Sequence, residues 1–109
     1  MTEQSLFVLA ALARGERHGY GIAQDSAALS DGRISLTAGT LYGVLSRLTS
    51  DGLIEQTREE TVEGRRRRYY RITAAGESAL AAETARLRSI VAVLGSQAPL
   101  RAGPTAGLA

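Results

Sequence analysis

Residues 37–73 read TAGTLYGVLSRLTSDGLIEQTREETVEGRRRRYYRIT and predict a helix followed directly by a β-hairpin. Thr37 is a favourable N-cap, because its hydroxyl can accept one of the free amide hydrogens at a helix start. One apolar face then follows at the i, i+3, i+4 and i+7 spacing of an α-helix, formed by Leu41, Val44, Leu45 and Leu48. Asp51-Gly52 is a helix stop, so the helix is expected over residues 37–50.

The hairpin is expected as two short strands, residues 53–61 and 66–72, joined across Val62-Glu63-Gly64-Arg65. Successive side chains of a strand point to opposite faces, which separates Arg67, Tyr69 and Arg71 from Arg68, Tyr70 and Ile72. Tyr70 and Ile72 are the expected inward pair.

Two helices are expected before this region. Leu6, Leu9, Leu12 and Ala13 recur at spacings of three and four, which predicts a helix over residues 2–14 that ends at Gly15. His18-Gly19-Tyr20-Gly21 predicts a glycine-flanked break, followed by a short second helix over residues 22–29 that closes near Ser30-Asp31-Gly32. Residues 33–36 are too few for an independent strand but could pair as a stub at a sheet edge.

After the hairpin, Thr73 is expected to cap a long helix that runs to about Leu94. Leu80, Leu87 and Leu94 recur every seven positions along it, and Ile90 and Val91 support the same apolar stripe. Such a helix of about 33 Å is longer than a small domain can cover, which favours pairing with a second copy. The alternative is a helix that folds back over its own domain. Residues 96–109 are rich in small residues, glycine and proline, and predict a flexible tail.

The polar surfaces of this central region favour contact with nucleic acid. The helix face opposite the leucines is small, polar and free of acidic residues, and consists of Gly39, Thr40, Gly43, Ser46, Arg47 and Ser50, with Tyr42 at its flank. All thirteen basic residues are arginine, and five of them fall within residues 65–71. The arginine fork binds phosphate oxygens in pairs. A solvated, merely solubilising hairpin edge is the other interpretation of these arginines.

Composition excludes several other classes of function. The chain has 109 residues, 22% charged, with a net charge of +2, no cysteine and one histidine, which rules out disulfides, thiol catalysis and cysteine-based zinc sites. It has no nucleophile beside a base, no apolar carboxylate pair and no glycine-rich phosphate loop, so neither an enzyme nor a bound cofactor or metal is expected. Without a long apolar segment or a signal peptide, a cytoplasmic protein is expected.

The order of elements predicts a mainly α-helical fold with a small β-hairpin, that is, a winged helix-turn-helix with a long C-terminal helix. The expected division is a DNA-binding domain over residues 1–73, a dimerisation helix over residues 74–95 and a tail over residues 96–109. The candidate DNA-binding residues are Thr37, Gly39, Thr40, Tyr42, Gly43, Ser46, Arg47, Arg65, Arg66, Arg67 and Arg68. The candidate dimer contacts are Leu80, Leu87, Ile90, Val91 and Leu94.

Four short motifs in this order resemble the PadR family of bacterial transcriptional regulators. They are His18-Gly19-Tyr20-Gly21-Ile22, Thr37-Ala38-Gly39-Thr40-Leu41-Tyr42, Leu45-Ser46-Arg47-Leu48 with Asp51-Gly52-Leu53-Ile54, and residues 68–76, RYYRITAAG. The resemblance covers roughly residues 6–94. It implies a homodimeric repressor that binds a palindromic operator in double-stranded DNA and is often released by a small aromatic or drug-like effector. It also implies dimerisation through the C-terminal helix, as in compact family members.

Two features depart from the family pattern, and some roles stay open. Gly43 stands where many members have proline or a larger residue, and the chain has no tryptophan to stack on flat effectors. Tyr42 could contact DNA or pack in the core. Tyr20 is expected in the core with Ile22, although the resemblance also allows it to approach the DNA backbone. His18 is expected to hydrogen-bond the backbone. A winged-helix interaction module, either an adaptor or an antirepressor whose basic hairpin binds an acidic protein, is the alternative function.

Overall fold

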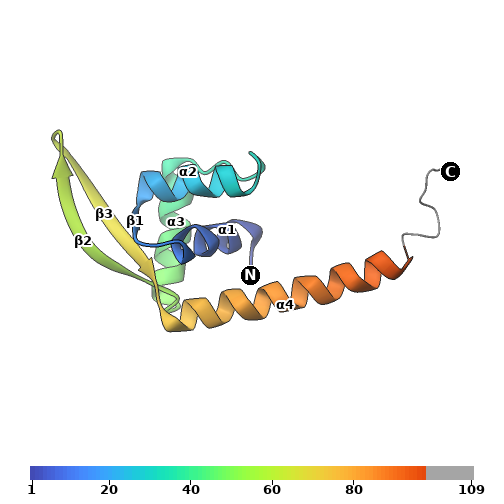
Figure 1. The fold of residues 1–109 in the computed structure, drawn as a ribbon. Helices are drawn as coiled ribbons and strands as arrows, with labels where there is room; N and C mark the ends of the chain where they lie inside the picture. Colours follow the sequence, from blue (N-terminus) through green and yellow to red (C-terminus); the bar gives the residue numbers. More distant parts are fainter. Residues whose placement is uncertain (98–109) are drawn as a thin grey trace.

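The computed structural model describes residues 1–97 and forms a winged helix-turn-helix with a long C-terminal helix (Figure 1). The elements in chain order are α1 (Glu3–Ala13), β1 (Arg17–His18), α2 (Gly19–Leu29), α3 (Ala38–Ser50), β2 (Ile54–Val62), β3 (Arg65–Ile72) and α4 (Ala74–Gln97). This confirms the expected mainly α-helical class with a hairpin. The expected flexible tail lies outside the described residues from position 98 onward.

The core lies between the first three helices and the root of the hairpin. Its fully or nearly fully buried members come from α1, α2, α3, β2 and β3: Val8, Leu9, Ala11, Leu12, Ile22, Leu41, Leu45, Leu48, Ile54 and Tyr70. Three of the four leucine-face positions predicted in α3 are buried, and Val44 packs against the cluster from its edge. In α1, however, Ala13 is exposed, because the buried face is completed by Val8 and Ala11 instead.

The hairpin of β2 and β3, here called the wing, forms as predicted. Glu63 and Gly64 make its two-residue turn with positive φ values of 52° and 76°, the conformation that matches the twist of the flanking strands. The strand pairing is irregular between Gln56 and Arg58, which leaves Thr57 as a bulge. Tyr70 is only 6% exposed and Ile72 packs against the core, so the expected inward pair is confirmed.

The expected break at residues 18–21 is wrong. Arg17 and His18 form the short strand β1, which pairs with Tyr69 and Tyr70 of β3, and α2 begins directly at Gly19. The His18 side chain is the N-cap, because its Nδ1 accepts the amide hydrogen of Gly21 at 3.2 Å. A capped start explains why two glycines in the first turn do not interrupt the helix.

Residues 33–36 form no independent strand, as expected, and they do not pair as an edge stub either, since the third strand of the sheet is β1, in the order β1-β3-β2. The segment between α2 and α3 is instead held by burial of Ile34, whose amide donates to the Ser30 hydroxyl at 2.9 Å. Tyr20 does not anchor α2 in the core, because it is 66% exposed, while Ile22 is fully buried as expected.

Helix α4 starts at a tight junction with the end of α3. Thr73 caps it by accepting the Gly76 amide hydrogen at 3.0 Å, and the Thr73 hydroxyl donates to the Gly52 carbonyl at 2.7 Å. The helix runs to Gln97, past the expected end near Leu94, so residues 96 and 97 are helical rather than part of a tail. Its distal half extends beyond the helices of the core (Figure 1). No helix within residues 1–97 combines the length and apolar character needed to cross a membrane.

Candidate nucleic-acid interface

The outward surface of α3 is exposed and carries no acidic side chain. All seven predicted DNA-contacting residues of this region are exposed, namely Thr37, Gly39, Thr40, Tyr42, Gly43, Ser46 and Arg47. A Cβ atom placed on Gly39 or Gly43 would meet no other atom within 4 Å, so the space above both residues is open. Thr37 accepts the Thr40 amide hydrogen at 3.3 Å, which confirms the predicted N-cap.

The wing presents its four consecutive arginines on two faces. Arg66 and Arg68 share the face of Tyr70, whereas Arg65 and Arg67 share the opposite face with Tyr69. Because β1 pairs only with Tyr69 and Tyr70, no strand within residues 1–97 pairs with the outer part of β3 on its β1 side. Arg65, Arg66 and Arg68 are exposed, and Arg67 is half-buried.

A cleft of about 470 Å³ lies where α2, α3 and the wing meet, and it joins the two predicted surfaces. It is lined by His18, Gly19, Tyr20, Tyr42, Arg65, Arg66, Arg67 and Arg68. Tyr42 is 45% exposed, so it lines this cleft rather than the core. A Cβ on Gly19 would lie 3.2 Å from the Tyr42 hydroxyl, which shows how closely α3 approaches the start of α2.

His18 bonds the backbone as expected, and its ring is also a neighbour of the wing. Because Nδ1 accepts the Gly21 amide hydrogen, the neutral ring carries its own proton on Nε2, which lies 3.3 Å from Nη1 of Arg67. Burial, followed by the positive charges of Arg67 and Arg17, lowers the pKa of His18. The imidazole is therefore neutral at pH 7.

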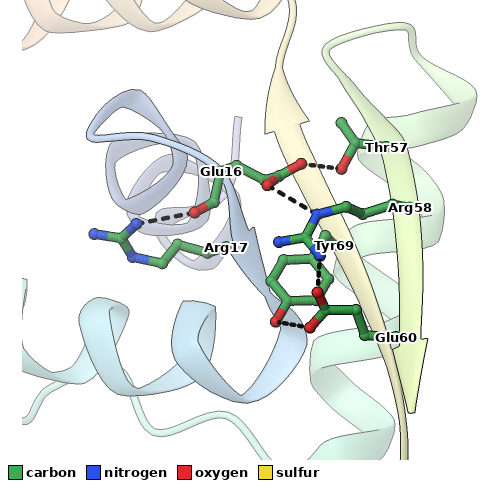
Figure 2. A network of polar contacts seen from close by, with 6 residues as sticks. All are labelled: Glu16, Arg17, Thr57, Arg58, Glu60 and Tyr69. Atoms are coloured by element: carbon green, nitrogen blue, oxygen red, sulfur yellow. Dashed lines mark hydrogen bonds and ion pairs between the residues drawn. The ribbon is translucent and has the colours of Figure 1, made fainter. Parts of the chain in front are cut away.

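A polar network holds the root of the wing against the loop before β1 (Figure 2). Arg58 lies over the Tyr69 ring, 3.8 Å from its centroid, and its guanidinium pairs with Glu16 and Glu60. Glu60 also accepts the Tyr69 hydroxyl at 3.0 Å, and Glu16 accepts the hydroxyl of the bulged residue Thr57. The Thr57 hydroxyl is the main cause that lowers the pKa of Glu16, and Arg58 is the main cause that lowers the pKa of Glu60. The network fixes the direction of the wing.

The carboxylates that face the wing arginines were missed at the sequence level. Glu59 pairs with both Arg66 and Arg68, and Glu55 pairs with Arg71 at 2.6 Å. The signal was present, because a hairpin that turns at Glu63-Gly64 places Glu59 opposite Arg68. The bulge at Thr57 then decides which residues of the lower wing face one another.

Comparison with known proteins identifies the family to which this fold belongs. The family model described as "Transcriptional regulator PadR-like family" matches residues 8–82. The chain belongs to the PadR-like family. This confirms the resemblance of its four motifs, and membership of a family of transcriptional regulators confirms the expectation that the protein is not an enzyme.

Relatives of this PadR-like regulator cover most of its length. It is 39% identical over 93 residues to the Mycobacterium tuberculosis protein named transcriptional regulator Rv3488, covering 84% of this chain and 83% of the relative. A PadR family transcription regulator from Clostridium difficile R20291 has a TM-score of 0.73 at 27% identity, covering 87% and 97% of the two chains. PadR from Bacillus subtilis, solved with operator DNA, shares the fold with a TM-score of 0.64 at 23% identity, covering 73% and 46%.

The PadR-like regulator carries a second candidate surface, on α4. Of the predicted dimer contacts, Leu80 is partly buried against the chain's own core, and Leu87 is half-buried. Farther along the same helix, Ile90, Val91 and Leu94 are exposed. Leu87, Val91 and Leu94 follow the i, i+4, i+7 spacing, so the helix face that is partly covered at Leu87 continues uncovered to the end of α4.

Proposed function

We propose that this PadR-like regulator is a sequence-specific protein that binds double-stranded DNA as a homodimer. The observation that carries the proposal is the exposed, acid-free face of α3 beside a cleft lined by four wing arginines. An acidic side chain beside the phosphates would repel DNA, so the acid-free face of a helix suits the major groove, and a basic wing can follow the adjacent backbone. The fold shared with Bacillus subtilis PadR, which was solved with operator DNA, supports this use of the surface.

Base contacts are assigned to α3 and phosphate contacts to its edges. Thr40, Ser46 and Arg47 present side chains that can bond base edges, and arginine is suited to the two acceptors of guanine. Tyr42 of α3 lines the cleft beside the wing arginines, where its hydroxyl can donate to a phosphate that crosses the cleft. The wing arginines supply electrostatic affinity with little choice of sequence.

The homodimer is assigned to the distal part of α4. Ile90, Val91 and Leu94 leave an apolar stripe in water, which a second copy of the same helix would cover. Two DNA-binding heads related by twofold symmetry would match a palindromic operator, with half-sites about one helical turn apart. A small aromatic or drug-like effector would bind between such helices, where aliphatic side chains offer an apolar site. Following its resemblance to the PadR family, the protein is proposed to repress transcription rather than to activate it.

Selection from a random duplex library, followed by fluorescence anisotropy, tests this function. The enriched duplex should show a twofold-symmetric motif and bind about a thousandfold more tightly than its scrambled version at near-physiological salt. Arg47→Ala should lose most of that preference, whereas Arg88→Ala, an equal loss of charge on the exposed side of α4, should keep it. No enrichment, with no binding to any duplex, would instead favour the module that binds an acidic protein.

A further inference from the structure

The wing arginines share a single acidic neighbour. Within residues 1–97, Glu59 is the only carboxylate within 4 Å of any of the four arginines at positions 65–68. Its Oε1 lies 3.5 Å from Nε of Arg66, and its Oε2 lies 3.3 Å from Nε of Arg68. Each carboxylate oxygen therefore faces one guanidinium group.

The register of the wing explains why Glu59 meets these two arginines. Glu59 is directly opposite Arg68 in the sheet, and Arg66 is two residues away on the same face of β3. Arg65 and Arg67 point to the other face. The acidic residue beside Glu59 on that other face, Glu60, is bound by Arg58 and by the Tyr69 hydroxyl instead (Figure 2).

We propose that Glu59 is an internal competitor for DNA phosphate and weakens the grip of the wing on every duplex. This inference rests on the proposed function, in which the wing binds the DNA backbone. A carboxylate accepts the same guanidinium hydrogens that a phosphate would accept, so DNA must displace Glu59 or bind two arginines that are already partly neutralised. The wing then contains two classes of arginine: Arg65 and Arg67 are available to phosphate, whereas Arg66 and Arg68 are guarded.

The geometry also allows the competitor to be displaced. All three partners are exposed, with side-chain exposure of 39% for Glu59, 69% for Arg66 and 48% for Arg68. Ion pairs in water are weak and form readily with other partners. A phosphate that reaches the wing can therefore replace the carboxylate. The free energy of binding is then less favourable than it would be with arginines that have no carboxylate partner.

Glu59→Gln tests the proposal, because the amide keeps the size of the side chain and removes its charge. Binding should tighten about three- to tenfold, as expected when two exposed ion pairs no longer have to be broken. The enriched duplex and its scrambled version should gain equally, because phosphate contacts carry no sequence information. The plot of log K against log salt should steepen by about one unit. Thermal melting should match the wild type, since Glu59 lies outside the core.

Glu55→Gln is the matched control on the same strand. It makes the same change in net charge but releases Arg71, at the root of the wing. Arg71 is three residues along β3 from Arg68, or about 10 Å, which is about one Debye length. The effect of Glu55→Gln on DNA affinity should therefore stay within about twofold. In a protein that already carries Arg66→Gln and Arg68→Gln, the Glu59→Gln change should give no further gain, because the guarded arginines are gone.

The outcomes separate this inference from the proposed function. Weaker binding by Glu59→Gln would show that the carboxylate orients the arginines for phosphate, and would overturn the proposal. A gain no larger than that of Glu55→Gln would overturn it as well, because net charge alone would then explain the change. If the wild-type protein binds no duplex, the proposed function fails and this inference fails with it.

Discussion

Replacing Gly76 by alanine should separate α4 from the root of the wing. Gly76 is buried in the first turn of α4, where the helix passes over the Leu53 carbonyl. A Cβ atom there would lie 2.0 Å from that oxygen and 2.7 Å from Cγ1 of Ile72, far inside van der Waals contact. The Leu53 carbonyl cannot easily move away, because it accepts the Thr73 amide hydrogen at 3.0 Å.

The expected loss of stability is large for a small domain. Overpacking against a fixed neighbour costs up to about 3 kcal/mol. Loss of the hydrogen bond to Thr73 adds about 1 kcal/mol. The better helix propensity of alanine returns about 1 kcal/mol. The net loss is about 3 kcal/mol, which corresponds to a decrease in Tm of about 12–24 °C for a domain of this size.

Thermal denaturation followed by circular dichroism measures this effect, and Gly95→Ala is the control. Gly95 lies in the same helix, but a Cβ there would meet nothing within 4 Å, so alanine should leave the Tm unchanged or raise it slightly. If Gly76→Ala melts within about 2 °C of the wild type, the close approach is not rigid and the reasoning is refuted.

Three further predictions concern the wing, α4 and the cap of α2. Arg65→Gln with Arg67→Gln should reduce the slope of log K against log salt by about two units in DNA-binding titrations, and an unchanged slope would remove this face of the wing from the interface. Val91→Asp should give a monomer in sedimentation experiments, whereas Ser89→Asp, on the opposite face of α4, should leave a dimer; a dimeric Val91→Asp protein would contradict the assigned contact. The free energy of unfolding should fall as pH decreases from 7.5 to 5.5, because burial lowers the pKa of folded His18 below 6.5 while the unfolded chain takes up the proton. His18→Asn keeps a capping acceptor and should lose this part of the pH dependence in urea unfolding; an unchanged dependence would place its cause elsewhere.

The elements predicted best are those whose signals are local. The apolar spacing, Thr37 cap and Asp51-Gly52 stop of α3 all lie within one short segment, and so do the alternation and turn of the wing. β1 was missed because its two residues are defined only by pairing with Tyr69 and Tyr70, about fifty positions later. A two-residue strand has no periodicity of its own to detect.

The candidate interface also has a part that the local sequence predicts and a part that depends on contacts between distant segments. The exposed residues of α3 follow from helical periodicity, because the face opposite the leucines must meet water. The run of arginines was visible in the sequence, but composition does not show which of these arginines form ion pairs with carboxylates. A turn at Glu63-Gly64 already implies that Glu59 faces Arg68, but only the structure shows that Glu59 pairs with Arg66 as well, while Arg65 and Arg67 have no carboxylate within 4 Å among residues 1–97.

By itself, the order of residues was enough to specify the winged helix-turn-helix, the exposed polar face of α3 and the arginine-rich wing. Each of these depends on neighbours within a few turns of helix or one hairpin. The three-dimensional structure alone decided that Tyr20 and Tyr42 line a cleft with the wing, and that Gly76 lies against the Leu53 carbonyl. These contacts join segments more than twenty residues apart, and their distances depend on how whole elements pack, which no local pattern records.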